Sequence, residues 1–161
     1  MKKHLFILIT FCISLSCLAQ NEAPEKIYDE KADAMATLNN AISQAEKESK
    51  YVLCQVGGNW CPWCLRFAAF VESDSLIHET VYNNFVYVHV NWSRDNKNPE
   101  AMKFLGNPAR FGFPVFVILD EKGKVIHIQN SAYLEENKGY SEKKVNDFLL
   151  MWTRQAVNTL K

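Results

Sequence analysis

The alternation of apolar and polar positions divides most of the chain into amphipathic helices and short strands. Residues 33–48 carry apolar side chains three and four positions apart, the period of a helix with one buried face, and Asp33 stands where an N-cap is expected. Residues 51–56, YVLCQV, form a short apolar run that Gly57-Gly58 ends. This pattern indicates a buried strand directly after the first helix.

Two further patterns predict strands in the second half of the chain. FVYVHVNW, residues 85–92, sets three valines on one face and Phe85, Tyr87 and His89 on the other. Both faces are largely apolar, as expected of a strand that helices cover on both sides. PVFVILD and VIHIQ flank the polar EKGK and predict an antiparallel hairpin that turns near Gly123.

The remaining segments predict helices and one loop. Pro62 fits the first turn of a helix, where its missing N–H costs nothing, and SDSLIHETVYNN predicts a second short helix capped by Ser73 or Asp74. A short helix is expected around residues 101–105, and residues 130–140 are expected to form a polar loop. The closing segment, SEKKVNDFLLMWTRQAVNTL, predicts one terminal helix.

The order of these elements predicts an α/β fold with a central mixed sheet and helices on both of its faces. The length of 161 residues is typical of a single domain with a hydrophobic core. We divide the chain into a signal peptide at residues 1–19, a polar lead segment at residues 20–32 and one domain at residues 33–161.

The N-terminus has the pattern of a secretory signal. Two lysines precede an apolar run from Leu5 to about Leu18, which is too short and wrongly flanked for a membrane span. We expect cleavage after Ala19, with small residues at the positions that a signal peptidase inspects. The pair Ser16-Cys17 leaves a lipid anchor on Cys17 open as an alternative.

Charge and cysteine content narrow the classes of function. Removing residues 1–19 takes away two lysines and no acid, so 16 basic and 18 acidic side chains remain and the formal net charge is −2. This balance offers no basic footprint for nucleic acid. Exported proteins meet an oxidising compartment, where cysteines tend to be paired or reactive. Of the three that remain, Cys54 lies within the apolar strand, and we expect it to be a buried, unreactive thiol.

Cys61 and Cys64 carry the strongest chemical signal. They stand two residues apart where a strand ends and a helix begins, so helix N–H groups and the helix dipole favour a negative charge on the Cys61 sulfur. We expect Cys61 to attack a substrate disulfide and the deeper Cys64 to resolve the mixed disulfide. Run backwards, the same steps oxidise a dithiol.

Two other interpretations of the pair are weaker. A zinc site needs two more ligands, and the sequence has neither a second CxxC nor a closely spaced pair of histidines. Inert thiols would leave the surrounding glycines and proline without a reason. We therefore expect neither a metal nor another cofactor.

From about Asp33 to its C-terminus, the chain resembles the thioredoxin superfamily, and more closely exported bacterial thioredoxin-like proteins with a WCxWC site. The similarity rests on CPWC with Trp60 before it, on EKESK before the YVLCQV strand, and on FGFPVFVILDEKGKVI. It implies a thioredoxin-like fold in which Pro114 is the cis-proline and the main chain of Phe113 pairs with an extended substrate. We expect Trp60, Pro62 and Trp63 to complete the docking surface.

One position departs from the family. Many thioredoxins hold a buried acid six residues before the first cysteine, and this chain has Gln55 there. Glutamine cannot act as a base, which leaves water, another group such as Glu72, or a slower resolution step. The departure weakens the case for a fast, general disulfide reductase.

These features together predict an exported, periplasmic thiol:disulfide oxidoreductase that reduces or isomerises protein disulfides. We expect its partners to be cysteine-containing envelope proteins and a membrane thiol-transport reductase that supplies electrons, and we expect a monomer. Two alternatives stay open. One is a thiol oxidant, and the other is a thioredoxin-fold binding module or holdase in which the pair is a structural disulfide.

Overall fold

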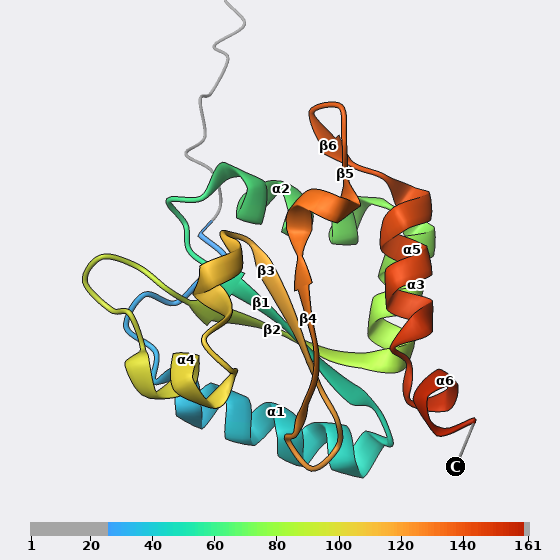
Figure 1. The fold of residues 1–161 in the computed structure, drawn as a ribbon, viewed down its shortest axis with the longest axis horizontal. Coiled ribbons are helices and arrows are strands. Elements are labelled where there is room, and N and C mark those ends of the chain that lie inside the picture. Colours follow the sequence, from blue (N-terminus) through green and yellow to red (C-terminus); the bar gives the residue numbers. More distant parts are fainter. Residues whose placement is uncertain (1–25, 160–161) are drawn as a thin grey trace, which may run out of the picture.

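A four-stranded mixed sheet forms the centre of the computed structural model, which describes residues 26–159 (Figure 1). Its strands are β1 (Tyr51–Gly57), β2 (Phe85–Asn91), β3 (Val115–Leu119) and β4 (Val125–Asn130), in the order β2-β1-β3-β4. Strands β1 and β2 run parallel, and the other two pairings are antiparallel. The predicted α/β fold with a mixed sheet is confirmed.

Helices cover both faces of this sheet. On one face, α1 (Ala34–Glu48) and α4 (Pro99–Phe104) share a hydrophobic core with Val52, Cys54 and Val56 of β1. On the other, α2 (Pro62–Ser73), α3 (Ser75–Asn84) and α5 (Glu142–Met151) pack on Tyr51 and Leu53. The alternating side chains of β1 thus enter two separate cores, because successive side chains of a strand point to opposite faces. A fully buried large apolar side chain contributes about 1.5–3 kcal/mol, so both cores stabilise the position of β1.

The predicted helix starts are confirmed by their caps. Asp33 accepts hydrogen bonds from the N–H groups of Met35 and Ala36 at 2.9 and 3.1 Å. Asp74, one of the two predicted caps of α3, accepts one from the N–H of Ile77 at 3.0 Å. Each cap satisfies N–H groups that have no partner within their own helix.

Two predictions for the C-terminal third are wrong. Residues 130–140 do not form a plain loop, because they contain the 3₁₀ helix η2 (Ser131–Leu134) and the two-residue strands β5 (Glu135–Glu136) and β6 (Gly139–Tyr140). Leu134 is buried, which draws this segment onto the core. The terminal helix is also broken: α5 ends at Met151, and α6 (Arg154–Asn158) follows with its own cap, Thr153, whose hydroxyl accepts from the N–H of Ala156 at 3.1 Å.

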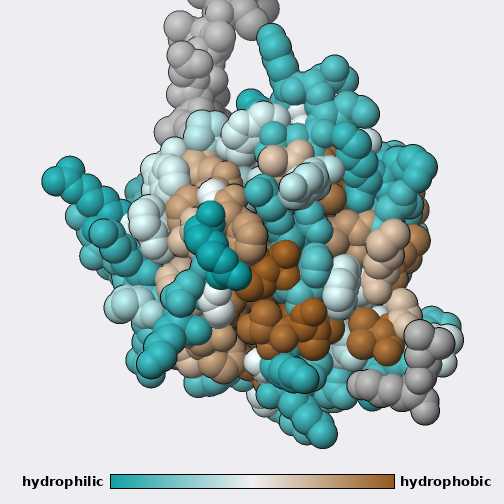
Figure 2. All heavy atoms as spheres, in the orientation of Figure 1, coloured by the Kyte–Doolittle hydropathy of each residue, from teal (hydrophilic) through white to brown (hydrophobic). Residues whose placement is uncertain are grey.

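Strand β4 lies at an edge of the sheet, and all of its residues are partly buried. Figure 2, in the orientation of Figure 1, shows hydrophobic side chains near the middle of the visible face of the molecule, with hydrophilic ones around them. The short η1 (Pro108–Phe111) leads into β3 beside this strand. The cysteine pair belongs to the start of α2, at the end of β1.

The predicted signal peptide, its cleavage site after Ala19 and the alternative anchor Cys17 lie outside the described residues. The part of the lead segment that the structure describes, residues 26–32, is bound to the domain through the contacts given below. Within residues 26–159, no helix has the length and apolar character needed to cross a membrane.

Candidate active site

The two cysteines are held at the start of α2. Cys61 is the N-cap residue, and its sulfur accepts a hydrogen bond from the N–H of Cys64 at 3.2 Å. Pro62 takes the first helical position, where a missing N–H leaves no hydrogen bond unmade. The two sulfurs form a disulfide, with the Cα atoms 5.2 Å apart. Because N–H groups at a helix start favour negative charge, Cys61 is the sulfur better placed to become a thiolate.

Accessibility also separates the two sulfurs. Cys64 is fully buried, whereas Cys61 keeps 4% of its surface exposed. Of the two residues, Cys61 is therefore the one nearer to solvent. The predicted burial of the remaining cysteine, Cys54, is confirmed, and burial raises the pKa of its thiol.

The segment before β3 brings a cis peptide bond to the site. The bond between Phe113 and Pro114 is cis, the isomer that the resemblance implies. Pro114 is buried, and Phe113 packs against the cluster of both cysteines. Gly112 precedes them with φ of 86°, a conformation that side-chain-bearing residues rarely adopt.

One side of the pair is bordered by an aromatic rim formed by Trp60, Trp92 and Phe113. The ring centroids lie 5.9 Å apart for Trp60 and Trp92, 5.4 Å for Trp60 and Phe113, and 4.8 Å for Trp92 and Phe113. The indole N–H of Trp60 donates to the carbonyl of Trp92 at 2.8 Å, yet 51% of Trp60 stays exposed. The rim can therefore contact a substrate without rearranging.

The rim depends on a glycine and borders a groove. A Cβ on Gly58 would lie 2.5 Å from Nε1 of Trp60 and 2.8 Å from the carbonyl oxygen of Trp92, so only glycine fits there. Beyond Trp60 and Trp92 lies a groove of about 640 Å³ that Lys31 and Arg94 also line. Sequence analysis had not assigned Trp92 to the site, because that role depends on its position beside β1.

Trp63 has different aromatic partners from Trp60. Its ring packs edge-on against Tyr140 of β6 at 5.6 Å, and the Arg66 guanidinium lies 4.6 Å above it. The Tyr140 hydroxyl donates to the Trp63 carbonyl at 3.2 Å. The two tryptophans of the motif therefore flank the pair in separate aromatic groups, and Pro62 between them is exposed.

Behind Cys64, four side chains form a hydrogen-bond chain: Tyr28, Gln55, Tyr87 and His89. Gln55 is fully buried, and its Nε2 donates to the Tyr28 hydroxyl at 2.6 Å and to the Cys64 carbonyl at 2.9 Å. The Tyr87 hydroxyl donates to Oε1 of Gln55. Nε2 of His89 lies 3.2 Å from the Tyr87 hydroxyl oxygen. Gln55 thus has all its hydrogen-bonding groups satisfied in the place where the family's acid was expected.

Burial sets the protonation of this chain. It raises the pKa of the Tyr28 and Tyr87 hydroxyls above their usual value and lowers the pKa of His89 to about 4. At neutral pH the four side chains of this hydrogen-bond chain are therefore all uncharged. Glu72, considered as a substitute for the family's acid, is exposed on α2, where its carboxylate accepts from the Tyr82 hydroxyl at 2.6 Å.

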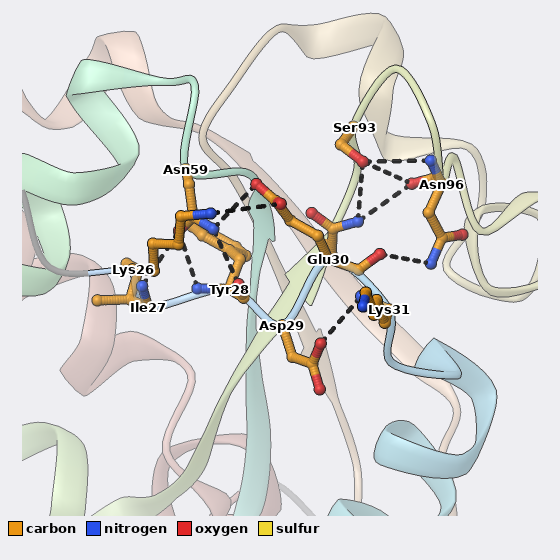
Figure 3. A network of polar contacts seen from close by, with 10 residues as sticks. Lys26, Ile27, Tyr28, Asp29, Glu30, Lys31, Asn59, Ser93 and Asn96 are labelled. Atoms are coloured by element: carbon orange, nitrogen blue, oxygen red, sulfur yellow. Dashed lines mark hydrogen bonds and ion pairs between the residues drawn. The ribbon is translucent and has the colours of Figure 1, made fainter.

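Tyr28 is a second site residue that the sequence patterns did not indicate. It comes from the lead segment, yet it is buried and packs with Cys61 and Cys64. Oδ1 of Asn59 accepts from the N–H groups of Ile27 and Tyr28 at 3.1 and 3.0 Å, and Nδ2 of Asn59 donates to the Tyr28 carbonyl at 2.9 Å (Figure 3). A large aromatic residue in an otherwise polar stretch was the available signal.

A second contact fixes the same segment further along. Nδ2 of Asn96, in the loop after β2, donates to the carbonyl of Glu30 at 3.1 Å (Figure 3). It also donates to the carbonyl of Ala32 at 3.3 Å. The segment is thus joined to the domain on both sides of Asp29. Among residues 26–159, no group of three or more His, Cys, Asp or Glu side chains is placed to share a metal ion.

Comparison with known proteins agrees with this geometry. A family model described as thioredoxin-like matches residues 33–121. Among solved structures, the chain is similar to a disulphide isomerase from Xylella fastidiosa Temecula1, with a TM-score of 0.67, 24% identity, and coverage of 76% of this chain and 93% of that one. At this identity the likeness shows the fold alone. The comparison with curated proteins gives no match.

Proposed function

This chain belongs to the thioredoxin-like family, and from this premise we propose that it is an exported thiol:disulfide oxidoreductase that reduces or isomerises disulfides of envelope proteins. One observation carries the proposal: a cysteine pair at a helix start lies beside a cis-proline, with Cys61 nearer to solvent than Cys64. A dithiol needs this asymmetry, because the attacking and resolving sulfurs have different tasks.

In the reductive direction, the Cys61 thiolate attacks one sulfur of a substrate disulfide. A bond forms between Cys61 and that sulfur, and the second substrate sulfur leaves with the electron pair and takes a proton from water. The Cys64 thiolate then attacks Cys61, so that the Cys61–Cys64 bond forms and the first substrate sulfur leaves as a thiolate. The substrate gains two electrons, and the protein's dithiol loses them.

Substrate recognition is proposed to use the surface around Cys61. The main chain of Phe113 would pair with an extended segment of the substrate, a form of strand addition. Trp60, Pro62 and Trp63 would contact its side chains. This arrangement suits unfolded or extended proteins better than a compact folded partner.

Export and electron supply complete the proposal. The pattern of residues 1–19 supports secretion to the periplasm, with a lipid anchor on Cys17 as the alternative. In an oxidising compartment a reductase must itself be reduced, so a membrane thiol-transport reductase would supply two electrons to the Cys61–Cys64 disulfide. An isomerase would also need the pair reduced, because Cys61 can attack only when its bond to Cys64 is open, but it would recover the electrons at the end of each cycle.

One observation favours a second candidate. Because only 4% of Cys61 is exposed, the pair could also act as a structural disulfide in a thioredoxin-fold binding module or holdase. Alkylation after mild reduction separates the two. An active dithiol gives one fast-reacting cysteine in the folded protein, whereas a structural disulfide gives none until the protein is denatured.

The decisive experiment is the redox equilibrium of the purified protein in graded glutathione buffers, followed by thiol labelling of Cys61 and Cys64. Potentials in the superfamily run from about −270 mV for thioredoxin to about −120 mV for a strong oxidant. A value near the thioredoxin end supports a reductase. One near the other end makes the protein a disulfide donor, and a disulfide that does not exchange in the folded state overturns the proposal.

A further inference from the structure

The Tyr28 hydroxyl and the Cys64 sulfur border the same small space. A Cβ on Gly57 would lie 2.4 Å from Sγ of Cys64 and 2.9 Å from the hydroxyl oxygen of Tyr28. Glycine leaves this space free, so the two atoms are neighbours beside the β1 backbone. The Tyr28 ring is buried in the same cluster as both cysteines, which fixes the hydroxyl in place.

The directions of the hydrogen bonds leave the Tyr28 proton available. The Cys64 carbonyl can only accept, so the end of the Gln55 amide that faces it is the nitrogen. That nitrogen uses its second N–H on the Tyr28 oxygen. Tyr28 is therefore the acceptor of this bond, and its own proton has no other partner in the part of the chain that the structure describes.

The other hydrogen bonds of this chain of side chains also point toward Tyr28. The Tyr87 hydroxyl gives its proton to Oε1 of Gln55, so its oxygen accepts from the Nε2–H of His89. Each group thus donates toward the sulfur, from His89 through Tyr87 and Gln55 to Tyr28. Hydrogen bonds in series polarise one another, which strengthens the last donor.

We propose that Tyr28 is a further catalytic residue, whose hydroxyl donates a hydrogen bond to the Cys64 sulfur in the reduced protein and stabilises the thiolate that resolves the mixed disulfide. The inference rests on the proposed function. It gives the lead segment, which lies outside the matched residues 33–121, a part in the chemistry.

The step keeps every proton accounted for. Cys64 releases its proton to water, and its thiolate accepts the bond from Tyr28. The thiolate attacks Cys61, the bond between Cys61 and the substrate breaks, and the substrate sulfur leaves with the electron pair and is protonated by water. Tyr28 keeps its own proton throughout, because burial holds its pKa above the usual value.

The hydrogen-bond chain that ends at Tyr28 would help Cys64 in a different way from a buried acid. A carboxylate takes the proton from the resolving cysteine, whereas a neutral donor lowers the energy of the thiolate that remains. Of the charged groups near the chain, Glu72 acts on its far end, where it raises the pKa of His89 against the larger effect of burial. The inferred arrangement needs no charged side chain beside Cys64 other than the thiolate itself.

The experiment measures the pKa of Cys64 in the full chain carrying Cys61→Ser, from the ultraviolet absorbance of the thiolate, with and without Tyr28→Phe. A hydrogen bond to a charged group is strong enough that its loss should raise the pKa by about one unit, a roughly tenfold smaller thiolate fraction near neutral pH. Tyr133→Phe is the matched control, because it removes the same hydroxyl from a side chain that is 75% exposed.

A second readout follows resolution itself. With both cysteines present, a mixed disulfide between Cys61 and a chromophoric aromatic thiol releases that thiol when Cys64 attacks. Tyr28→Phe should slow release about threefold, because a more basic thiolate is a better nucleophile and offsets part of the tenfold loss. Tyr133→Phe should leave the rate unchanged.

The outcomes separate the inference from the proposed function. A wild-type protein whose disulfide does not exchange overturns the function. An exchanging wild type whose Cys64 pKa does not change in Tyr28→Phe overturns only the inference. If Tyr28→Phe does not fold, Tyr28→3-fluorotyrosine keeps the ring and makes a stronger donor. It should then lower the Cys64 pKa, and an unchanged or higher pKa contradicts the inference.

Discussion

The two sides of the cysteine pair have opposite character. The aromatic rim is apolar and partly exposed, whereas the hydrogen-bond chain behind Cys64 is polar, buried at Tyr28 and Gln55 and partly buried at Tyr87 and His89. Exposed aromatic surface binds a partner through contact area, and enclosed polar groups act through direction and distance. From this difference we infer that recognition and sulfur chemistry depend on separate residues, so that each can be changed without the other.

We expect the largest effect from substitutions of the cysteine pair itself, which lies between the aromatic rim and the hydrogen-bond chain. Cys61→Ser removes the cysteine of the pair that lies nearer to solvent, so we expect complete loss of disulfide exchange. Cys64→Ser keeps the attack but blocks resolution, and it should accumulate proteins bound to Cys61 that reducing gels release. Exchange that survives in Cys61→Ser would move the chemistry elsewhere.

The next effect concerns the enclosed side. Gln55→Leu leaves the Tyr87 hydroxyl and the Cys64 carbonyl without their amide partner in a buried place. Each buried unsatisfied group costs about 1–3 kcal/mol, so urea denaturation should show a loss of about 2–4 kcal/mol. Gln44→Leu makes the same change on the exposed side of α1 and should shift stability by less than about 0.5 kcal/mol. Equal losses would mean that enclosure of Gln55 has no special role.

Acid should lower the folding stability of the protein through His89, at the far end of the hydrogen-bond chain. Burial lowers the pKa of His89 to about 4 in the folded protein, from an ordinary value of 6.5. Between these values the unfolded chain binds more protons, so stability falls as pH falls from 6.5 toward 4, by up to about 1.4 kcal/mol per pH unit. Above pH 6.5 this contribution is fully present.

The check is denaturation at several pH values. His89→Asn should flatten the curve through this window, because it removes the imidazole whose pKa burial lowers. The same slope in His89→Asn would mean that other groups cause the acid loss.

The smallest effect belongs to the exposed side. Trp60→Ala should lower kcat/KM for protein substrates by about two- to tenfold, because one aromatic contact contributes about 0.5–1.5 kcal/mol. Turnover of a small aromatic disulfide and the pKa values of both cysteines should stay nearly unchanged. Tyr133→Ala is the control, because Tyr133 is exposed and has no part in the aromatic contacts of Trp60, Trp63, Trp92 or Phe113. A changed cysteine pKa in Trp60→Ala would show that the two sides are not independent.

Local signals in the sequence predicted much of the fold. Asp33 and Asp74 cap their helices, and Pro62 opens α2, because each of these preferences depends on a few neighbouring residues. The break after Trp152 was missed, since the apolar spacing continues through it. In the structure the Trp152 ring stacks on His127 at 4.2 Å, a contact that helical periodicity cannot indicate.

The candidate site was predictable only in part. CPWC and Phe113-Pro114 were found because a family pattern marks them, and the structure brings them together. Tyr28 and Trp92 were missed because their contacts join distant parts of the chain: Tyr28 meets Gln55 across 27 positions, and Trp92 meets Trp60 across 32. The Trp60–Trp92 contact depends on how β1 and β2 align in the sheet, and the Tyr28–Gln55 contact depends on how Asn59 holds the lead segment. No short motif records either.

The attachment of the lead segment through Asn59 has a consequence for where this protein can be cut. The matched family region begins at residue 33, and a shortened protein starting there would keep both cores and both cysteines. It would lack Tyr28, leaving an unfilled space beside Cys64 and an unpaired N–H on Gln55. We therefore expect a protein cut at residue 33 to resolve mixed disulfides more slowly than one that begins before Tyr28, even where both fold.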